Sequence, residues 1–159
     1  MRGSIDALLR AAAQVLSRAG VPSPAVDAEL LLAHALHREL ADLRRARLMG
    51  EEVPEATIST YQGLISRRAE RVPVQHLTGR THFAGVDLLV GPGVFIPRPE
   101  TELMVELALT ALEGLQSPTV VDLCTGSGAL ALAIAHARPD ARVGAVELSP
   151  EAHRYAVAN

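Results

Sequence analysis

A glycine-rich turn between a β-branched apolar run and an alanine-rich run carries the residues best suited to binding a cofactor. Residues 119–123 read as a strand with Asp122 near its end. Gly126 and Gly128 follow, and the Ala/Leu pattern of residues 127–137 predicts a helix after them. Because glycine has no Cβ and adopts positive φ easily, the main chain of such a turn can approach a ligand closely. The first N–H groups of the helix lack partners within it and can bind that ligand.

A second acid lies where the ribose of a cofactor would need a hydrogen-bond acceptor. Residues 142–147 predict another strand, which ends in Glu147, about twenty residues after the turn. Residues 126–131 also fit the dinucleotide pattern G-x-G-x-x-G/A, so a nicotinamide or flavin enzyme remains possible. Asp122 favours a methyltransferase instead, because an adenosyl sulfonium is positive and carries no pyrophosphate. A carboxylate there can accept a hydrogen bond from an ammonium group or orient the amides of the loop.

Helices must occupy the first 70 residues. Apolar residues recur there at helical spacing, and Gly20 and Pro22 separate the first two runs. Ser4 and Ser23 are candidate N-caps. The short connections predict a small helical bundle, with helices over about 5–19, 24–36, 39–48 and 54–68.

Beyond residue 73 the pattern becomes that of strands and turns. Residues 81–90 predict a hairpin with Gly85 at or near its turn, and the prolines and glycines of residues 91–99 exclude a helix. We expect a helix over 99–115, then the strand, helix and strand described above, and a last helix from residue 150. Strand–helix–strand at this spacing implies parallel strands with a right-handed crossover, so the fold class is α/β. Two such strands leave bare faces and an unpaired edge, so we expect a fragment of a longer natural protein.

Composition excludes several classes of protein. Hydrophobic residues make up 48% and charged residues 21%, which suits a globular chain. No apolar run approaches the roughly 20 residues of a membrane span, and the N-terminus does not resemble a secretory signal. A single cysteine excludes an internal disulfide and fits the cytoplasm.

Charge is unevenly distributed along the chain. Residues 1–80 hold 11 Arg and 9 acidic residues, whereas residues 81–159 hold 4 Arg and 9 acidic residues. The first half could face an acidic or RNA-containing partner, although an ordinary solvated helix surface explains so small an excess better. Arg67, Arg68 and Arg71 could grip such a partner or simply complement the end of a helix.

Three stretches closely resemble the glutamine methyltransferases that modify peptide-chain release factors, the HemK/PrmC family. They are His82-Phe-Ala-Gly85, Val94-Phe-Ile-Pro-Arg-Pro-Glu-Thr-Glu102 and Asp122-Leu-Cys-Thr-Gly-Ser-Gly128. The resemblance covers nearly the whole chain, and the second stretch is its most specific part. It implies a helical substrate-recognition domain over 1–72, a hairpin linker over 73–93, and over 94–159 the start of a Rossmann-like class I methyltransferase domain.

The resemblance also implies an activity. Family members transfer a methyl group from S-adenosylmethionine to the side-chain amide nitrogen of the glutamine in a Gly-Gly-Gln motif. The partner would be a release factor, which brings an indirect proximity to the ribosome, with no membrane and no metal. The resemblance implies that Glu147 contacts the ribose hydroxyls of the cofactor. The methionine part would be lined by Cys124, Thr125, Gly126, Ser127 and Gly128, and beside the methionine end and the sulfonium would lie Phe95, Arg98 and Thr101.

Two departures from the family pattern have consequences. The family usually has Gly where this chain has Cys124, and a position that needs positive φ would be strained here. The Asn-Pro-Pro-Tyr motif, whose asparagine and proline carbonyl hold the substrate amide in the family, is absent from the chain. We therefore expect the chain to be inactive and assign no catalytic residue.

Alternatives remain open at this stage. The chain could belong to an adenosylmethionine-dependent enzyme that acts on another substrate, such as nucleic acid, or act as a release-factor-binding module without catalysis. Cys124 could be a nucleophile, although a small residue tolerated in the loop is a simpler explanation. His34 and His37 could share a metal ion, but no further ligands stand nearby in the sequence to complete such a site.

Overall fold

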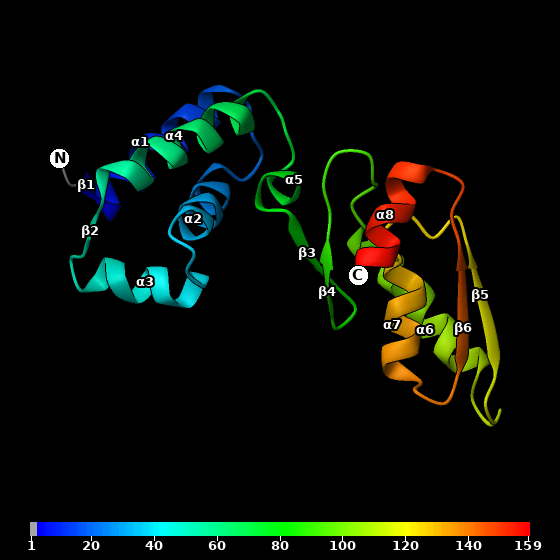
Figure 1. Ribbon diagram of the computed structural model, residues 1–159. Helices are drawn as coiled ribbons and strands as arrows, with labels where there is room; N and C mark the ends of the chain where they lie inside the picture. Colours follow the sequence, from blue (N-terminus) through cyan, green and yellow to red (C-terminus); the bar gives the residue numbers. More distant parts are fainter. Residues whose placement is uncertain (1–2) are drawn as a thin grey trace. The chain divides into compact units, whose positions relative to one another are not determined.

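The computed structural model describes residues 3–159, which form two compact units. The first ends at Thr78 and the second covers Gly79–Asn159 (Figure 1). The hairpin expected as part of a linker groups with the second unit, because its apolar side chains are buried there.

The first unit is a helical bundle. Four helices, α1 to α4, confirm the pattern of the sequence to within a few residues at each end. A short helix α5 and a pair of two-residue antiparallel strands were not predicted. The elements are β1 Gly3–Ser4, α1 Ile5–Arg18, α2 Pro24–Ala35, α3 Leu40–Leu48, β2 Glu52–Val53, α4 Glu55–Ala69 and α5 Val74–Thr78.

The core of this bundle is aliphatic. Leu16, Leu31 and Leu32 are fully buried where α1, α2 and α4 pack together. Burial of each such side chain contributes about 1.5–3 kcal/mol. Ser4 and Ser23 precede their helices as predicted, but neither side chain makes a capping hydrogen bond. The helices are therefore held mainly by their apolar faces.

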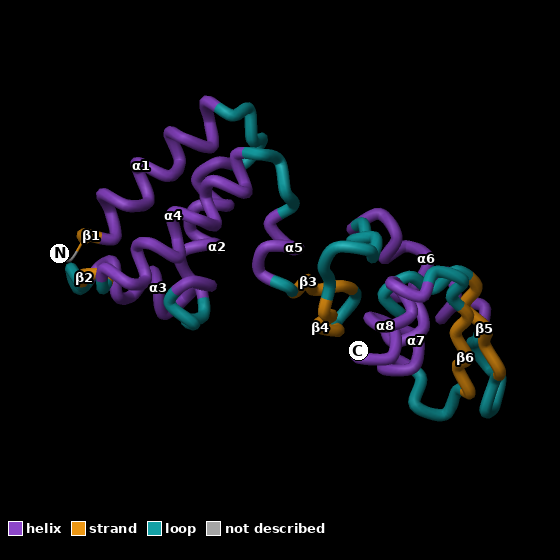
Figure 2. Tube along the Cα trace, turned by 45° about the horizontal axis from the view of Figure 1, so that its top comes forward, coloured by secondary structure: helices purple, strands orange, loops and turns teal. Residues whose placement is uncertain are grey.

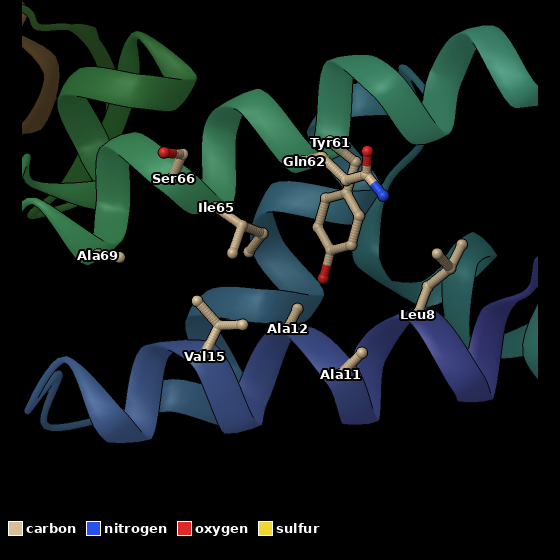
Figure 3. A pocket seen from close by; sticks show the side chains of 9 residues that line it. All are labelled: Leu8, Ala11, Ala12, Val15, Tyr61, Gln62, Ile65, Ser66 and Ala69. Carbon is tan, nitrogen blue, oxygen red and sulfur yellow. The ribbon is translucent and has the colours of Figure 1, made fainter.

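A groove runs along the surface between α1 and α4 (Figure 3). Its volume is about 340 Å³, and the small side chains of alanines on both helices leave this space open. Val15 is 44% exposed on its α1 wall, while Tyr61 on α4 is buried and donates from its hydroxyl to the Ala28 carbonyl at 3.1 Å.

The second unit combines a hairpin, a parallel strand pair and helices. Figure 2 shows β3 beside β4 and β5 beside β6. The predicted hairpin is confirmed, with Gly85 in its turn, and so are the two later strands and the last helix. The elements are β3 Arg80–Phe83, β4 Val86–Leu89, the 3₁₀ turn η1 Pro99–Thr101, α6 Glu102–Ala111, β5 Thr119–Leu123, α7 Ala129–Ala137, β6 Arg142–Val146 and α8 Pro150–Ala158.

The strands β5 and β6 pair in parallel, as the sequence predicts, and α7 connects them. Val120 lies opposite Val143 on the face that packs against α7. The other face carries Val121, Leu123 and Val146, which are 58%, 70% and 55% exposed. The coarse α/β class is therefore confirmed, with one face of the pair covered.

The hairpin packs on α7 through Phe83 and Leu88, which are buried with Ile134. Its turn is held by Glu102 at the start of α6, whose carboxylate accepts the Ala84 main-chain N–H at 3.0 Å. These contacts explain why the hairpin is part of the second unit.

Two helix boundaries differ from the prediction. The helix expected over 99–115 begins as a 3₁₀ turn and ends at Ala111, before Gly114 at φ 75°. The helix expected from residue 127 begins at Ala129, because Gly128 has φ 85° and ends the loop. Within residues 3–159, no helix combines the length and apolar character that crossing a membrane requires.

Candidate cofactor site

The loop between β5 and α7 has an unusual backbone. Cys124, Gly126 and Gly128 have φ values of 63°, 61° and 85°. The Gly128 N–H donates to the Thr125 carbonyl at 2.9 Å, and the Thr125 N–H donates to the Val146 carbonyl of β6 at 3.0 Å. The loop is thus a tight turn anchored to the end of the neighbouring strand.

Cys124 occupies a position that glycine would adopt without strain. The family usually has glycine here, and the left-handed backbone means that Cys124 is strained, since a Cβ at positive φ costs energy. The thiol is exposed. No general base is hydrogen-bonded to it among the described residues, so a nucleophilic role has no support here.

Asp122 orients the loop. Its carboxylate accepts the Thr125 hydroxyl at 2.5 Å and the Ala131 main-chain N–H at 3.3 Å. Ala131 is the third residue of α7, so Asp122 satisfies one of the N–H groups that a helix leaves without an internal partner. Asp122 therefore ties the loop to the start of α7 through a hydroxyl of the loop and a main-chain N–H of the helix.

Glu147 pins the loop from the end of β6. One carboxylate oxygen accepts the Gly126 N–H at 2.7 Å and the other accepts the Ser149 N–H at 2.9 Å. These two hydrogen bonds favour the charged form and hold the pKa of Glu147 below its usual value. The acid thus has a structural function in addition to any contact with a ribose.

A pocket of about 200 Å³ opens beside this loop. One wall comes from the segment before α6, where the Arg98 guanidinium carbon lies 5.5 Å from the ring centroid of Phe95. Phe95 is 68% exposed. The walls contain seven of the nine predicted contact residues: Phe95, Arg98, Thr101, Cys124, Thr125, Gly126 and Ser127.

The other two predicted residues lie outside the lining. Glu147 contacts the loop as described, and Gly128 packs against helices. A Cβ added to Gly128 would lie 3.2 Å from Leu132 Cδ1 and 3.6 Å from Ala156 Cα. Gly128 therefore permits close packing as well as the turn.

Sequence reasoning missed part of the lining. Pro97, Leu123, Ala129 and Leu130 also line the pocket. Pro97 and Leu123 lie in the stretches that carry the family resemblance, whereas Ala129 and Leu130 are of types that suit any helix and have no local signal of their own. With them, the pocket combines an apolar lining, main-chain groups, one carboxylate and one guanidinium, which suits a largely apolar ligand with a few charged groups.

The remaining sequence hypotheses concern the first unit. The rings of His34 and His37 lie 6.4 Å apart, and burial followed by the charge of His37 lowers the pKa of His34. Within residues 3–159, no group of three or more His, Cys, Asp or Glu side chains could hold a metal ion.

Two of the three arginines suspected of gripping a partner are used inside the bundle. Arg68 forms a buried ion pair with Asp27 at 2.6 Å, and Arg71 donates to the Gly20 carbonyl. The basic side chains of α3 are paired as well, since Arg44 and Arg47 contact acids on α2 and α1. These arginines are therefore committed to contacts within the bundle.

Comparison with known proteins places the chain. Residues 7–79 match the family model of the PrmC N-terminal domain. Three similar proteins carry the name release factor glutamine methyltransferase. The one from Mycolicibacterium smegmatis is 49% identical over 95% of this chain and 52% of its own length. The one from Bifidobacterium longum is 47% identical over 92% and 51%, and the one from Deinococcus radiodurans is 49% identical over 92% and 52%.

These matches extend from the helical bundle through the glycine loop, and the chain spans about half the length of the curated relatives it matches. Residues 7–79 therefore belong to the PrmC N-terminal domain family, and nearly the whole chain is similar to proteins named release factor glutamine methyltransferase.

Proposed function

We propose that this chain carries the S-adenosylmethionine pocket of a methyltransferase that modifies the glutamine side-chain amide of the Gly-Gly-Gln motif of peptide-chain release factors. The observation that carries the proposal is the pocket at the carboxyl end of β5, where Asp122 and Glu147 pin a glycine loop. The names of the relatives support the substrate.

The charges of the pocket fit the proposed cofactor. The Arg98 guanidinium would pair with the methionine carboxylate, and the Phe95 ring would cover the apolar part of that side chain. Asp122 also lines the pocket, and its negative charge would favour the positively charged cofactor there. When bound, S-adenosylmethionine supplies an electrophilic methyl group on its sulfonium.

The residues of this chain would contribute binding and orientation. An amide nitrogen is a poor nucleophile because its lone pair is delocalised, so catalysis depends on positioning. In the proposed enzyme, the fixed loop orients the cofactor, and a separate Asn-Pro-Pro-Tyr motif orients the amide. Because this chain lacks that motif, we infer that the 159 residues alone bind the cofactor without transferring its methyl group.

The domain assignment follows from the same family. We propose that residues 94–159 begin a Rossmann-like class I methyltransferase domain and that residues 1–72 recognise the release factor, with residues 73–93 between them. The parallel β5–β6 pair connected through α7 supports the first assignment. The match of residues 7–79 to the PrmC N-terminal domain supports the second.

Calorimetry with S-adenosylhomocysteine tests the pocket. The chain should bind this product, and Gly126→Val should weaken binding more than tenfold. A Cβ at Gly126 would meet no atom within 4 Å, so it would project into open space at φ 61°, where a branched residue is also strained. The control is Gly63→Ala, since Gly63 lies on the exposed surface of α4.

Two results would contradict the proposal. One is an affinity of Gly126→Val within twofold of the original. The other is binding of NADH with no response to S-adenosylhomocysteine, which would favour an oxidoreductase.

A further inference from the structure

The side chain of Asn159 joins two separate segments of the second unit. Its carbonyl oxygen accepts the Leu89 main-chain N–H at 2.6 Å, and its amide donates to the Leu89 carbonyl at 3.2 Å. The same amide donates to the Ser127 carbonyl at 2.8 Å. A primary amide has one acceptor oxygen and two N–H donors, so this arrangement uses the whole group. Asn159 pairs with β4 as a neighbouring strand would and also reaches the glycine loop.

These contacts fix the Ser127–Gly128 peptide. Asn159 holds its carbonyl, and its N–H donates to the Thr125 carbonyl at 2.9 Å. Because a peptide group is planar, hydrogen bonds at both its ends determine the orientation of the whole plane. Ser127 is only 2% exposed, so removing the donor would leave a buried acceptor unpaired.

Leu89 leads directly into the opposite wall of the pocket. The segment after it places Val90 and Val94 in a small core with Ala152 of α8. Phe95, the first residue of that wall, follows at once. One side chain therefore ties the strand that leads to Phe95 to the loop that faces it.

We propose that Asn159 is a positioning residue for the cofactor pocket, which acts by holding the Ser127–Gly128 peptide in register with β4. This inference rests on the proposed function and extends it to a residue outside the pocket lining. It predicts that changes at Asn159 affect ligand affinity through the loop.

The test compares two Asn159 variants with two controls. Asn159→Asp keeps the size of the side chain but places a carboxylate oxygen against the Ser127 carbonyl. Asn159→Ala removes the amide altogether and serves as the second variant should Asn159→Asp fail to fold. Tyr155→Phe loses a different α8 hydrogen bond, from its hydroxyl to the Pro92 carbonyl at 3.4 Å. Gln116→Glu makes the same amide-to-acid change at an exposed position.

Three measurements separate positioning from general stability. They are the affinity for S-adenosylhomocysteine by calorimetry, the amide NMR signals of Gly126–Gly128 without ligand, and the thermal midpoint. Both Asn159 variants should weaken binding at least fivefold and shift the Gly128 amide signal. Both controls should bind within twofold with that signal in place, even where the thermal midpoint falls.

A folded Asn159 variant with affinity within twofold and unmoved loop signals would overturn the inference. If the unmodified chain does not bind S-adenosylhomocysteine at all, the proposed function fails. The Gly128 amide signal then decides whether Asn159 positions the loop.

Discussion

Single residues around the glycine loop have opposite effects on its stability. The carboxylates of Asp122 and Glu147 each accept a main-chain N–H and so hold the loop in place. Cys124 destabilises the loop, because residues with a Cβ adopt its φ of 63° only at a cost in energy. A loop that is already fixed loses less entropy when a ligand binds.

Replacing Cys124 by glycine should stabilise the chain. Relief of the left-handed strain is worth about 1–2 kcal/mol, and the greater freedom of glycine when unfolded returns up to about 1 kcal/mol. We expect a net gain of up to about 1.5 kcal/mol in the free energy of unfolding, measured by urea unfolding. Cys124→Ala is the control, since it removes the thiol and keeps the strain. Equal stability of the Gly and Ala variants would show that the relief of strain does not exceed the entropy cost of glycine, and would contradict the expected gain.

Elements of the second unit are fastened to one another by charged side chains at their ends. Arg138, just after α7, donates to the carbonyls of Leu112 and Leu115 at 2.8 and 2.9 Å and so holds the end of α6. Asp140 pairs with Arg138 at 2.8 Å and accepts the Ser117 N–H at 3.1 Å. This clasp fixes the chain between α6 and β5.

Acid should open this clasp. The hydrogen bond from Arg138, supported by the Ser117 N–H, lowers the pKa of Asp140 to about 2. An unfolded aspartate titrates near about 4. A lowered folded pKa means that the contribution of Asp140 is full above pH 4 and is lost as the pH falls from about 4 to about 2.

Urea unfolding of the chain and of Asp140→Asn across this range measures the effect. The stability difference between them should be constant above pH 5 and shrink below pH 4. A difference that stays constant down to pH 2 would contradict the assignment of the low pKa to this pair.

At the scale of the whole molecule, local patterns predicted the elements and missed the contacts between distant segments. The strand Thr119–Leu123 was placed correctly, because a β-branched run followed by a glycine turn is a local signal. The buried Asp27–Arg68 pair and the Asn159 bridge join residues far apart in sequence, and no spacing rule marks them. Seven pocket residues were found because the family resemblance identified two loops that local rules cannot bring together.

The two units have separate cores, and this separation predicts how a ligand changes unfolding. A ligand that binds only the folded second unit raises the stability of that unit by mass action. The chain has two tyrosines and no tryptophan, with Tyr61 in the first unit and Tyr155 in the second. Tyr155→Phe therefore leaves a fluorescent reporter of the first unit, and Tyr61→Phe leaves one of the second.

With S-adenosylhomocysteine at a hundred times its Kd, the free energy of unfolding that Tyr155 reports should rise by about 2.7 kcal/mol. The Tyr61 signal should keep its midpoint, because the pocket residues belong to Gly79–Asn159 alone. Far-UV circular dichroism, which sees both units, should then separate into two transitions as ligand is added. Equal shifts of both tyrosine signals would mean that the units unfold as one, and cofactor binding would then stabilise the helical unit together with the pocket.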